Sequence, residues 1–324
     1  MKRKIVFLWI GRLGDLAVSL RFISGFRKRY PDDEIIFIGS NKNIELAILS
    51  GVFDKVYQYP LKITPLAICE IILFYFKHIL FKNYFMIIDL NPSPSNSSYF
   101  IMKFANAKHK VSFVKNKKVC HTQGIEVEEL MPMRQKYRKM AKELGVEYDE
   151  NYHISVDKMD MRSKLSIAND YPIIGIFAGN FSKIGHRWPA EKFIRLTNII
   201  IEKLPKLNIV YITDPYEFKI LKAKILSHLP TKYVISNNIK ELCMIINSIN
   251  LLLTNNTGPL HIADLISTPT LSINTCYSAT CWLPESKIHF YVKSSNWRTC
   301  HDIEIEEVFE KLIFALNGLK LRYE

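Results

Sequence analysis

Short apolar runs of strand length alternate with longer helical patterns along nearly the whole chain of 324 residues. This alternation is typical of parallel sheets whose connecting helices cover both faces. The runs that we expect to be strands form two series: Lys4–Ile10, Glu34–Ile38, Lys55–Tyr59, Tyr84–Leu90 and Lys110–Val114, then Pro172–Ala178, Leu207–Ile212, Lys232–Ile235, Asn250–Thr254 and Thr270–Asn274. The pattern therefore predicts an α/β fold with two Rossmann-like halves.

The connecting segments predict helices, and a polar stretch predicts where one half ends. Residues 149–171 interrupt the alternation, so we expect an N-terminal domain of residues 1–155 and a C-terminal domain of residues 156–324. Paired domains of this type bind ligands between the carboxyl ends of their strands. The expected helices are Asp15–Tyr30, Asn43–Ser50, Pro65–Phe81, Met133–Leu144, Ala190–Leu204, Tyr216–Leu226, Ile239–Ile249, Pro259–Ile266 and Ile303–Leu316.

Lysine and arginine outnumber aspartate and glutamate by 44 to 31, which gives a formal net charge of +13. The basic residues concentrate in segments 21–29, 103–118 and 134–142. Such an excess suits nucleic acid, an anionic membrane surface or an anionic substrate, and it equally suits a solvated face. Nucleic acid is disfavoured because the sequence contains no nucleic-acid-binding motif.

The sequence contains no run of about 18 uncharged apolar residues, the length needed to span a bilayer. Segment Leu66–Phe81 comes closest, but it carries Glu70, Lys77 and His78. The N-terminal run Ile5–Ile10 is too short for the core of a signal peptide. We therefore expect a cytoplasmic protein.

The six cysteines are scattered, and no C-x2-C pair occurs. Cys276, Cys281 and Cys300 do not have the spacing of a common zinc site, so reduced and mostly buried thiols are the favoured interpretation. A metal cluster of these three with His301 is the alternative. We predict no metal.

The segment Leu251–Asp264 contains the sharpest functional signal. An apolar run ends in Asn255-Asn256-Thr257-Gly258, and Pro259 follows where the first turn of a helix tolerates proline. A strand, a tight turn and a helix N-terminus together direct backbone N–H groups and a positive dipole end at one point. This pattern predicts a phosphate or pyrophosphate site. His261 either contacts such a phosphate or simply packs on its helix.

Two further loops follow strands of the same predicted sheet. After Pro172–Ala178 come small and polar residues and then the cations Lys183, His186 and Arg187, a group suited to stabilise a pyrophosphate leaving group. After Leu207–Ile212 comes Glu217, which either bonds ribose hydroxyls or is a first-turn glutamate favoured by the helix dipole.

The first strand ends in Gly11-Arg12-Leu13-Gly14-Asp15, which is not the G-x-G-x-x-G dinucleotide fingerprint. A nicotinamide dehydrogenase is therefore disfavoured. Asp15 stands at the junction of loop and helix. It is either the helix N-cap or a carboxylate that accepts a proton from a hydroxyl nucleophile.

These motifs, in this order, resemble the bacterial ADP-heptose:lipopolysaccharide heptosyltransferase family (glycosyltransferase family nine). The family's first loop reads like the Gly14-Asp15 pair, its middle motif ends in a basic W-P like His186–Pro189, and its last motif D-T-G-x-x-H-x-A corresponds to Asn256–Ala263. The resemblance spans nearly the whole chain.

The resemblance implies a GT-B fold, in which two Rossmann-like domains face each other across a cleft. The N-terminal domain would bind the acceptor and the C-terminal domain the nucleotide sugar, and the terminal helix Ile303–Leu316 could pack on the N-terminal domain. The implied reaction is inverting, metal-independent transfer of heptose from ADP-L-glycero-D-manno-heptose to a lipopolysaccharide core or a related anionic glycan. No cofactor is implied, and the sequence has no D-x-D motif.

The resemblance also implies roles for individual residues. Asp15 would be the catalytic base. Two positions depart from the family pattern: Asn256 replaces its aspartate, and His186 replaces its lysine, with Lys183 nearby as a substitute. The expected donor-binding residues are Asn180, Ser182, Lys183, His186, Glu217, Asn256, Thr257, Gly258 and His261, and the expected acceptor-binding residues are Arg12, Lys108 and Lys110.

The expected partners are a nucleotide sugar and an anionic glycolipid or oligosaccharide. The basic segment 103–118 would hold phosphates or carboxylates of the acceptor or rest on anionic lipid, which suits an enzyme on the cytoplasmic face of the inner membrane. Two alternatives are a GT-B glycosyltransferase with another nucleotide-sugar donor or a capsule or protein acceptor, and a catalytically degenerate GT-B scaffold.

Overall fold

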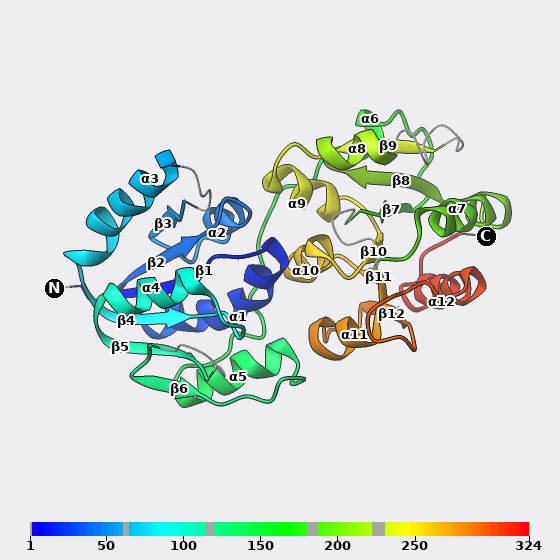
Figure 1. Ribbon diagram of the computed structural model, residues 1–324. Coiled ribbons are helices and arrows are strands. Elements are labelled where there is room, and N and C mark those ends of the chain that lie inside the picture. Colours follow the sequence, from blue (N-terminus) through cyan, green and yellow to red (C-terminus); the bar gives the residue numbers. More distant parts are fainter. Residues whose placement is uncertain (1, 61–64, 115–119, 180–186, 222–230, 324) are drawn as a thin grey trace. The chain divides into compact units, whose positions relative to one another are not determined.

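The computed structural model describes residues 2–60, 65–114, 120–179, 187–221 and 231–323. The chain divides into two compact units, Met1–Tyr152 and His153–Glu324 (Figure 1). The division falls three residues before the boundary expected from the sequence.

The first unit is built on a six-stranded sheet in the order β3-β2-β1-β4-β5-β6, and every pair in it is parallel. Its strands are β1 (Lys4–Trp9), β2 (Glu34–Gly39), β3 (Lys55–Gln58), β4 (Asn83–Asp89), β5 (Asn106–Phe113) and β6 (Gln123–Ile125). Its helices are α1 (Leu13–Arg29), α2 (Ile44–Leu49), α3 (Pro65–Tyr75), the π-helical turn η1 (Phe76–Leu80), α4 (Asn96–Phe104) and α5 (Met133–Glu143).

Helices cover both faces of this sheet. Phe7 of β1 packs against Phe22 and Phe26 of α1 on one face. On the other face, the buried side chains of α3, η1 and α4 form one core with those of the sheet, among them Val6, Leu8, Ile36, Ile38, Phe74, Ile79, Ile101 and Met102. Burial on both faces explains why the central strands are continuous apolar runs.

The second unit has a six-stranded parallel sheet in the order β12-β11-β10-β7-β8-β9. Its strands are β7 (Ile173–Phe177), β8 (Asn208–Thr213), β9 (Lys232–Ile235), β10 (Leu251–Asn255), β11 (Thr270–Asn274) and β12 (His289–Lys293). Its helices are α6 (Met161–Lys164), α7 (Ala190–Lys203), α8 (Pro215–Leu221), α9 (Ile239–Asn247), α10 (Gly258–Leu265), α11 (Cys276–Trp282) and α12 (Ile305–Gly318).

The terminal helix α12 belongs to the second unit. Val308, Leu312 and Leu316 of this helix are buried in the core of that unit, together with Phe193 and Ile200 of α7. The sequence also allowed this helix to pack on the N-terminal domain. The division of the chain instead places α12 with the C-terminal sheet.

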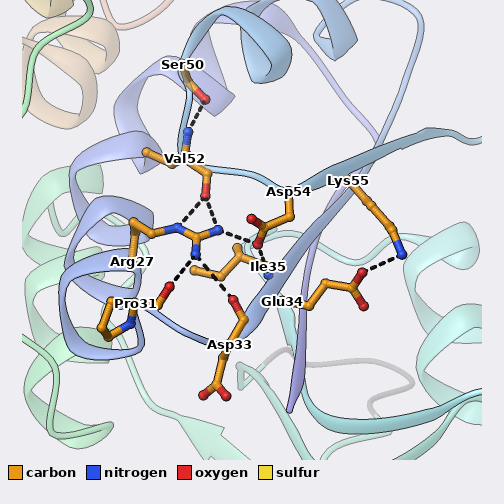
Figure 2. A network of polar contacts seen from close by, with 9 residues as sticks. All are labelled: Arg27, Pro31, Asp33, Glu34, Ile35, Ser50, Val52, Asp54 and Lys55. Carbon is orange, nitrogen blue, oxygen red and sulfur yellow. Dashed lines mark hydrogen bonds and ion pairs between the residues drawn. The ribbon is translucent and has the colours of Figure 1, made fainter. Parts of the chain in front are cut away.

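A polar network fixes the end of α1 to the sheet of the first unit (Figure 2). Arg27 donates to the carbonyl oxygen of Val52 from Nε at 3.2 Å and from Nη2 at 3.1 Å, and to that of Asp33 from Nη1 at 3.2 Å. It also pairs with Asp54, which accepts from the backbone N–H of Ile35 at 2.7 Å. One guanidinium thus joins α1 to the turns before β2 and β3.

None of the six cysteines, all of which lie in described residues, forms a disulfide bond. Burial raises the pKa of the Cys300 thiol to about 12, and the neighbouring Asp302 adds to this shift. Within the described ranges, no group of three or more His, Cys, Asp or Glu side chains is arranged to hold a metal ion, and Cys276, Cys281, Cys300 and His301 do not form one. None of the helices in this part of the chain is long and apolar enough to cross a membrane.

Candidate active site

The candidate donor site lies at the carboxyl ends of the central strands of the second sheet. The chain begins this sheet at β7, adds β8 and β9 on one side, and then returns to place β10 and β11 on the other. In open α/β sheets, ligands bind where the strand order reverses in this way. The loops after β7, β8 and β10, which the sequence singles out, all leave the sheet at this end.

The turn between β10 and α10 is held by two asparagine side chains. Asn255, which is buried, accepts from the backbone N–H of Trp188 at 2.9 Å and donates to the carbonyl oxygen of Ala178 at 3.3 Å. Asn256 donates from Nδ2 to Oδ1 of Asn274, at the end of β11, at 2.7 Å. These bonds fix the turn to the strands on both sides of β10.

The N-terminus of α10 follows directly from this turn. Thr257 is the N-cap in an extended conformation, its side chain makes no capping bond, and Gly258 opens the helix with Pro259 beside it. The hydroxyl of Thr257 instead donates to the carbonyl oxygen of Asn255 at 3.4 Å. A rigidly held turn that presents a helix N-terminus is suited to receive an anion.

Glu217 lies across the loop that follows β7. A Cβ on Gly179 would come within 1.8 Å of Oε2 of Glu217, so the glycine leaves room for the carboxylate in this position. Asp214 sets the start of α8, because its Oδ1 accepts from the backbone N–H groups of Tyr216 and Glu217, each at 2.8 Å. The structure therefore brings Glu217, predicted from the sequence, to the carboxyl end of β7.

Arg187 is a buried cation at the same carboxyl end of the sheet. Burial lowers the pKa of its guanidinium below the usual value, while the charges of Glu191 and Glu217 raise it. Arg187, before α7, and Glu217, in the first turn of α8, therefore lie close enough to interact, and they follow the neighbouring strands β7 and β8. A cation and a carboxylate at the switch point can bind a diphosphate and sugar hydroxyls, respectively.

His261 is buried on α10, and its ring centroid lies 6.2 Å from that of Trp282 on α11. The histidine thus contributes to the packing of these two helices. The donor residues predicted at Asn180, Ser182, Lys183 and His186 lie outside the described residues.

In the first unit, Asp15 lies in the first turn of α1, at the carboxyl end of β1. The N-cap of this helix is Arg12, so Asp15 is not the capping residue. The preceding loop is tied down by Asn43, which donates to the carbonyl oxygen of Trp9 at 2.9 Å, and by Ser40, which donates to that of Gly11 at 2.6 Å. The half-buried carboxylate of Asp15 is thus carried on the first turn of a helix whose preceding loop is fixed.

Two residues to which the sequence pattern assigns no role lie near Asp15. Tyr137 of α5 is fully buried, and its hydroxyl donates to the carbonyl oxygen of Leu90 at 3.0 Å. Burial raises the pKa of this phenol well above its ordinary value, and the charges of Asp15 and Asp89 raise it further. Asp89 ends β4, which pairs directly with β1. The carboxylates of Asp15 and Asp89 and the neutral phenol of Tyr137 therefore lie near the carboxyl ends of β1 and β4.

The predicted acceptor residues are spread over the first sheet. Arg12 is exposed immediately before α1. Lys110 lies on β5, three residues before the carboxyl end of that strand. It pairs with Ile87 of β4. Lys108 lies two residues earlier, toward the end of the sheet at which β5 starts. The strand register does not bring Lys108 next to Asp15.

A sequence model of glycosyltransferase family 9 (heptosyltransferase) matches residues 73–312, which is most of the chain. This chain belongs to glycosyltransferase family 9. No curated protein is detectably similar to it in sequence.

Solved structures of low sequence identity share the fold. The structure of glycosyltransferase family 9 from Veillonella parvula DSM 2008 matches with a TM-score of 0.81 at 16% identity, over 98% of both chains. E. coli heptosyltransferase WaaC with ADP matches with a TM-score of 0.75 at 11% identity, over 96% of this chain and 99% of that chain. E. coli ADP-heptose lps heptosyltransferase II matches with a TM-score of 0.74 at 16% identity, over 99% of this chain and 100% of that chain. The fold of this family 9 glycosyltransferase is therefore GT-B.

For this family 9 enzyme, the sequence identified the turns at Asp15 and Asn256 but not Asp89, Tyr137 or Asp214. Asp89 had a detectable signal, because it is a charged residue near the end of the otherwise apolar run Tyr84–Leu90. Tyr137 had none, since its position depends on the packing of α5 against α1 and on the bond to Leu90 after β4.

Proposed function

We propose that this glycosyltransferase transfers heptose from ADP-L-glycero-D-manno-heptose to a lipopolysaccharide core or a related anionic glycan, with inversion and without a metal ion. The observation that carries the proposal is the motif Asn256–Ala263, which forms the N-terminus of α10 at the switch point of the second sheet. In agreement with it, the solved structures of similar fold include heptosyltransferases with ADP and with ADP-2-deoxy-2-fluoro heptose.

On the donor side, the diphosphate would bind at the N-terminus of α10, where Asn256, Thr257 and Gly258 form the turn. Negative charge grows on the diphosphate as its bond to the sugar breaks, so a fixed dipole and the guanidinium of Arg187 would stabilise the transition state more than the ground state. Glu217 would accept hydrogen bonds from the ribose hydroxyls. Lys183 and His186 keep their predicted role at the phosphates.

On the acceptor side, Asp15 would take the proton of the acceptor hydroxyl as it attacks the anomeric carbon. The bond from this oxygen to the sugar forms as the bond to the diphosphate breaks, which inverts the configuration. Tyr137 stays protonated beside Asp15 because its pKa is raised, so it acts as a neutral hydrogen-bonding group. Arg12 would contact the anionic acceptor, a role also predicted for Lys108 and Lys110.

Substitution of the proposed base tests the mechanism. We expect Asp15→Asn to lower kcat by about 10²–10⁴-fold and to leave ADP affinity nearly unchanged, because the amide keeps the shape of the carboxylate but accepts no proton. The matched control is Asp32→Asn, an exposed aspartate of the same unit, which should retain full activity. Full activity of Asp15→Asn in steady-state assays would refute the assignment.

Donor screening separates the proposal from its alternatives. Calorimetry with ADP-heptose and with ADP- and UDP-linked hexoses should show preferential binding of ADP-heptose, whereas tighter binding of another nucleotide sugar would support a different transferase. Binding without turnover of any acceptor would support a degenerate scaffold. The proposed place of action is the cytoplasmic face of the inner membrane.

A further inference from the structure

Helices α3 and α4 and the turn η1 of the first unit, with the residue that follows this turn, expose large apolar side chains. Soluble monomers seldom expose many such side chains in one place unless the patch binds something. The exposed fractions lie between 46% and 75% for the residues that we call the α3–α4 apolar surface: Ile68, Ile72, Leu73, Phe76, Phe81, Phe100 and Phe104.

Side-chain contacts make this surface continuous across the two helices. Phe76 and Phe81 stack with ring centroids 5.8 Å apart, and Phe100 and Phe104 stack at 6.3 Å. Tyr75, which directly precedes Phe76 at the end of α3, lies edge-on to Phe104 of α4 with ring centroids 6.1 Å apart and so links the two helices. The aromatic rings therefore form one patch rather than isolated exposed residues.

The same segments are also apolar on their inner side. Phe74, Ile79 and Ile101 are buried against the first sheet, so the outward residues are not needed to hold these helices on it. A helix that only covers a sheet has a polar outer face, and one that is apolar all round is normally covered on both sides. The outer face of α3 and α4 is therefore suited to be covered by a partner.

The charges around the surface indicate which partner. Lys77, Lys82 and Lys103 are exposed beside the apolar residues, and Nζ of Lys103 lies 5.7 Å from the centre of the Phe104 ring. Between Pro65 and Phe113 the acidic residues are Glu70 and Asp89, and Asp89 is buried. Protein interfaces are depleted in lysine, whereas helices that lie on anionic membranes combine aromatic and aliphatic residues with lysine.

We propose that the α3–α4 apolar surface docks this enzyme on a bilayer that contains anionic phospholipid. The apolar side chains would enter the boundary between head groups and acyl chains, and the lysines would contact the lipid phosphates. The inference rests on the proposed function in one respect, since docking is useful to a transferase whose acceptor is a glycolipid. Docking is thereby assigned to these particular residues, whereas the sequence indicated only the basic segment 103–118.

Vesicle binding by the full-length protein tests this proposal. We expect the wild type to sediment with phosphatidylcholine vesicles that contain phosphatidylglycerol, and less so with phosphatidylcholine alone or at high salt. Leu73→Ser/Phe81→Ser changes the two most exposed members of the surface, at 65% and 75%, and should weaken binding by about ten-fold or more. The matched control Ile48→Ser/Phe314→Ser changes side chains that are 64% and 60% exposed outside the surface, and should bind like the wild type.

Two results would overturn the proposal: absence of wild-type binding to the anionic vesicles, or equal binding by the Leu73→Ser/Phe81→Ser variant and the wild type. If that variant instead changes the molar mass in light scattering and leaves vesicle binding intact, the surface joins two copies of the chain and the proposal also fails. ADP calorimetry on the same samples keeps the two proposals apart. Normal ADP binding without vesicle binding contradicts docking alone, whereas loss of ADP binding in the wild type contradicts the proposed function.

Discussion

At the scale of single residues, Asn256 is where the chain departs from the family motif, and its contacts give a physical reason. Its amide Nδ2 donates to Oδ1 of Asn274 at 2.7 Å. The orientation of the Asn274 amide is itself fixed, because its Nδ2 donates to the carbonyl oxygens of Ser272 and Val292 at 3.0 and 3.2 Å. An aspartate at position 256 would place two acceptors against each other.

We therefore predict that Asn256→Asp lowers the free energy of unfolding by about 1–3 kcal/mol, the cost of a buried polar group that loses its partner, and weakens ADP binding. The matched control is Asn106→Asp. Asn106 donates to Asn83 at the same distance of 2.7 Å but in an exposed pair, where water can replace the lost bond. Urea unfolding and ADP calorimetry check the prediction, and an Asn256→Asp variant as stable as the wild type would contradict it.

At the scale of elements, the segment that follows α5 is fastened to α1. Asp149 is buried and accepts from the hydroxyl of Ser24 and pairs with Lys28, both at 2.7 Å. A methyl group on Gly25 would come within 1.8 Å of the carbonyl oxygen of Glu147, so the segment lies directly on the helix. Burial raises the pKa of Asp149, but Lys28 and Ser24 lower it more, and the net pKa is below the ordinary value.

We predict that Asp149→Asn lowers the free energy of unfolding at neutral pH by about 1–2 kcal/mol. Because the folded pKa is depressed, the contribution of the carboxylate is fully present above the ordinary pKa near 3.9 and is lost as the pH falls through the folded pKa. The difference between wild type and variant should therefore shrink in urea titrations below about pH 4. The exposed Arg138–Glu150 pair is the control, since Glu150→Gln should cost less than about 1 kcal/mol. A difference independent of pH would contradict the assignment.

Elements buried on both faces were predictable from the sequence, whereas two of the edge strands, β6 and β12, were not. The five residues of β10 are all buried, and its first three, Leu251–Leu253, form the apolar run that marks a central strand. In contrast, β6 and β12 lie at sheet edges and bury few side chains, so neither gives a clear pattern. The helix expected over Pro65–Phe81 continues as the π-turn η1 after Tyr75, a change of geometry for which the apolar pattern of the segment gives no signal.

At the scale of the whole molecule, the second unit contains all that a separate domain needs. Its sheet, its core and the terminal helix α12 all lie within His153–Glu324, and its length is that of an ordinary domain. The turn before α10 and the carboxylate of Glu217 also belong to this unit. If the donor site is as proposed, ADP binding should therefore survive removal of the first unit.

We predict that a fragment of residues 153–324 unfolds cooperatively and binds ADP with an affinity close to that of the full chain, as measured by circular dichroism and calorimetry. A shorter fragment that ends at residue 304 is the control. It lacks α12 and thus Val308, Leu312 and Leu316, whose burial is worth roughly 5–9 kcal/mol, comparable with the total stability of a domain. The shorter fragment should therefore be unfolded. A folded 153–324 fragment that fails to bind ADP would show that the first unit supplies part of the donor site, and the assignment of the diphosphate to α10 alone would be wrong.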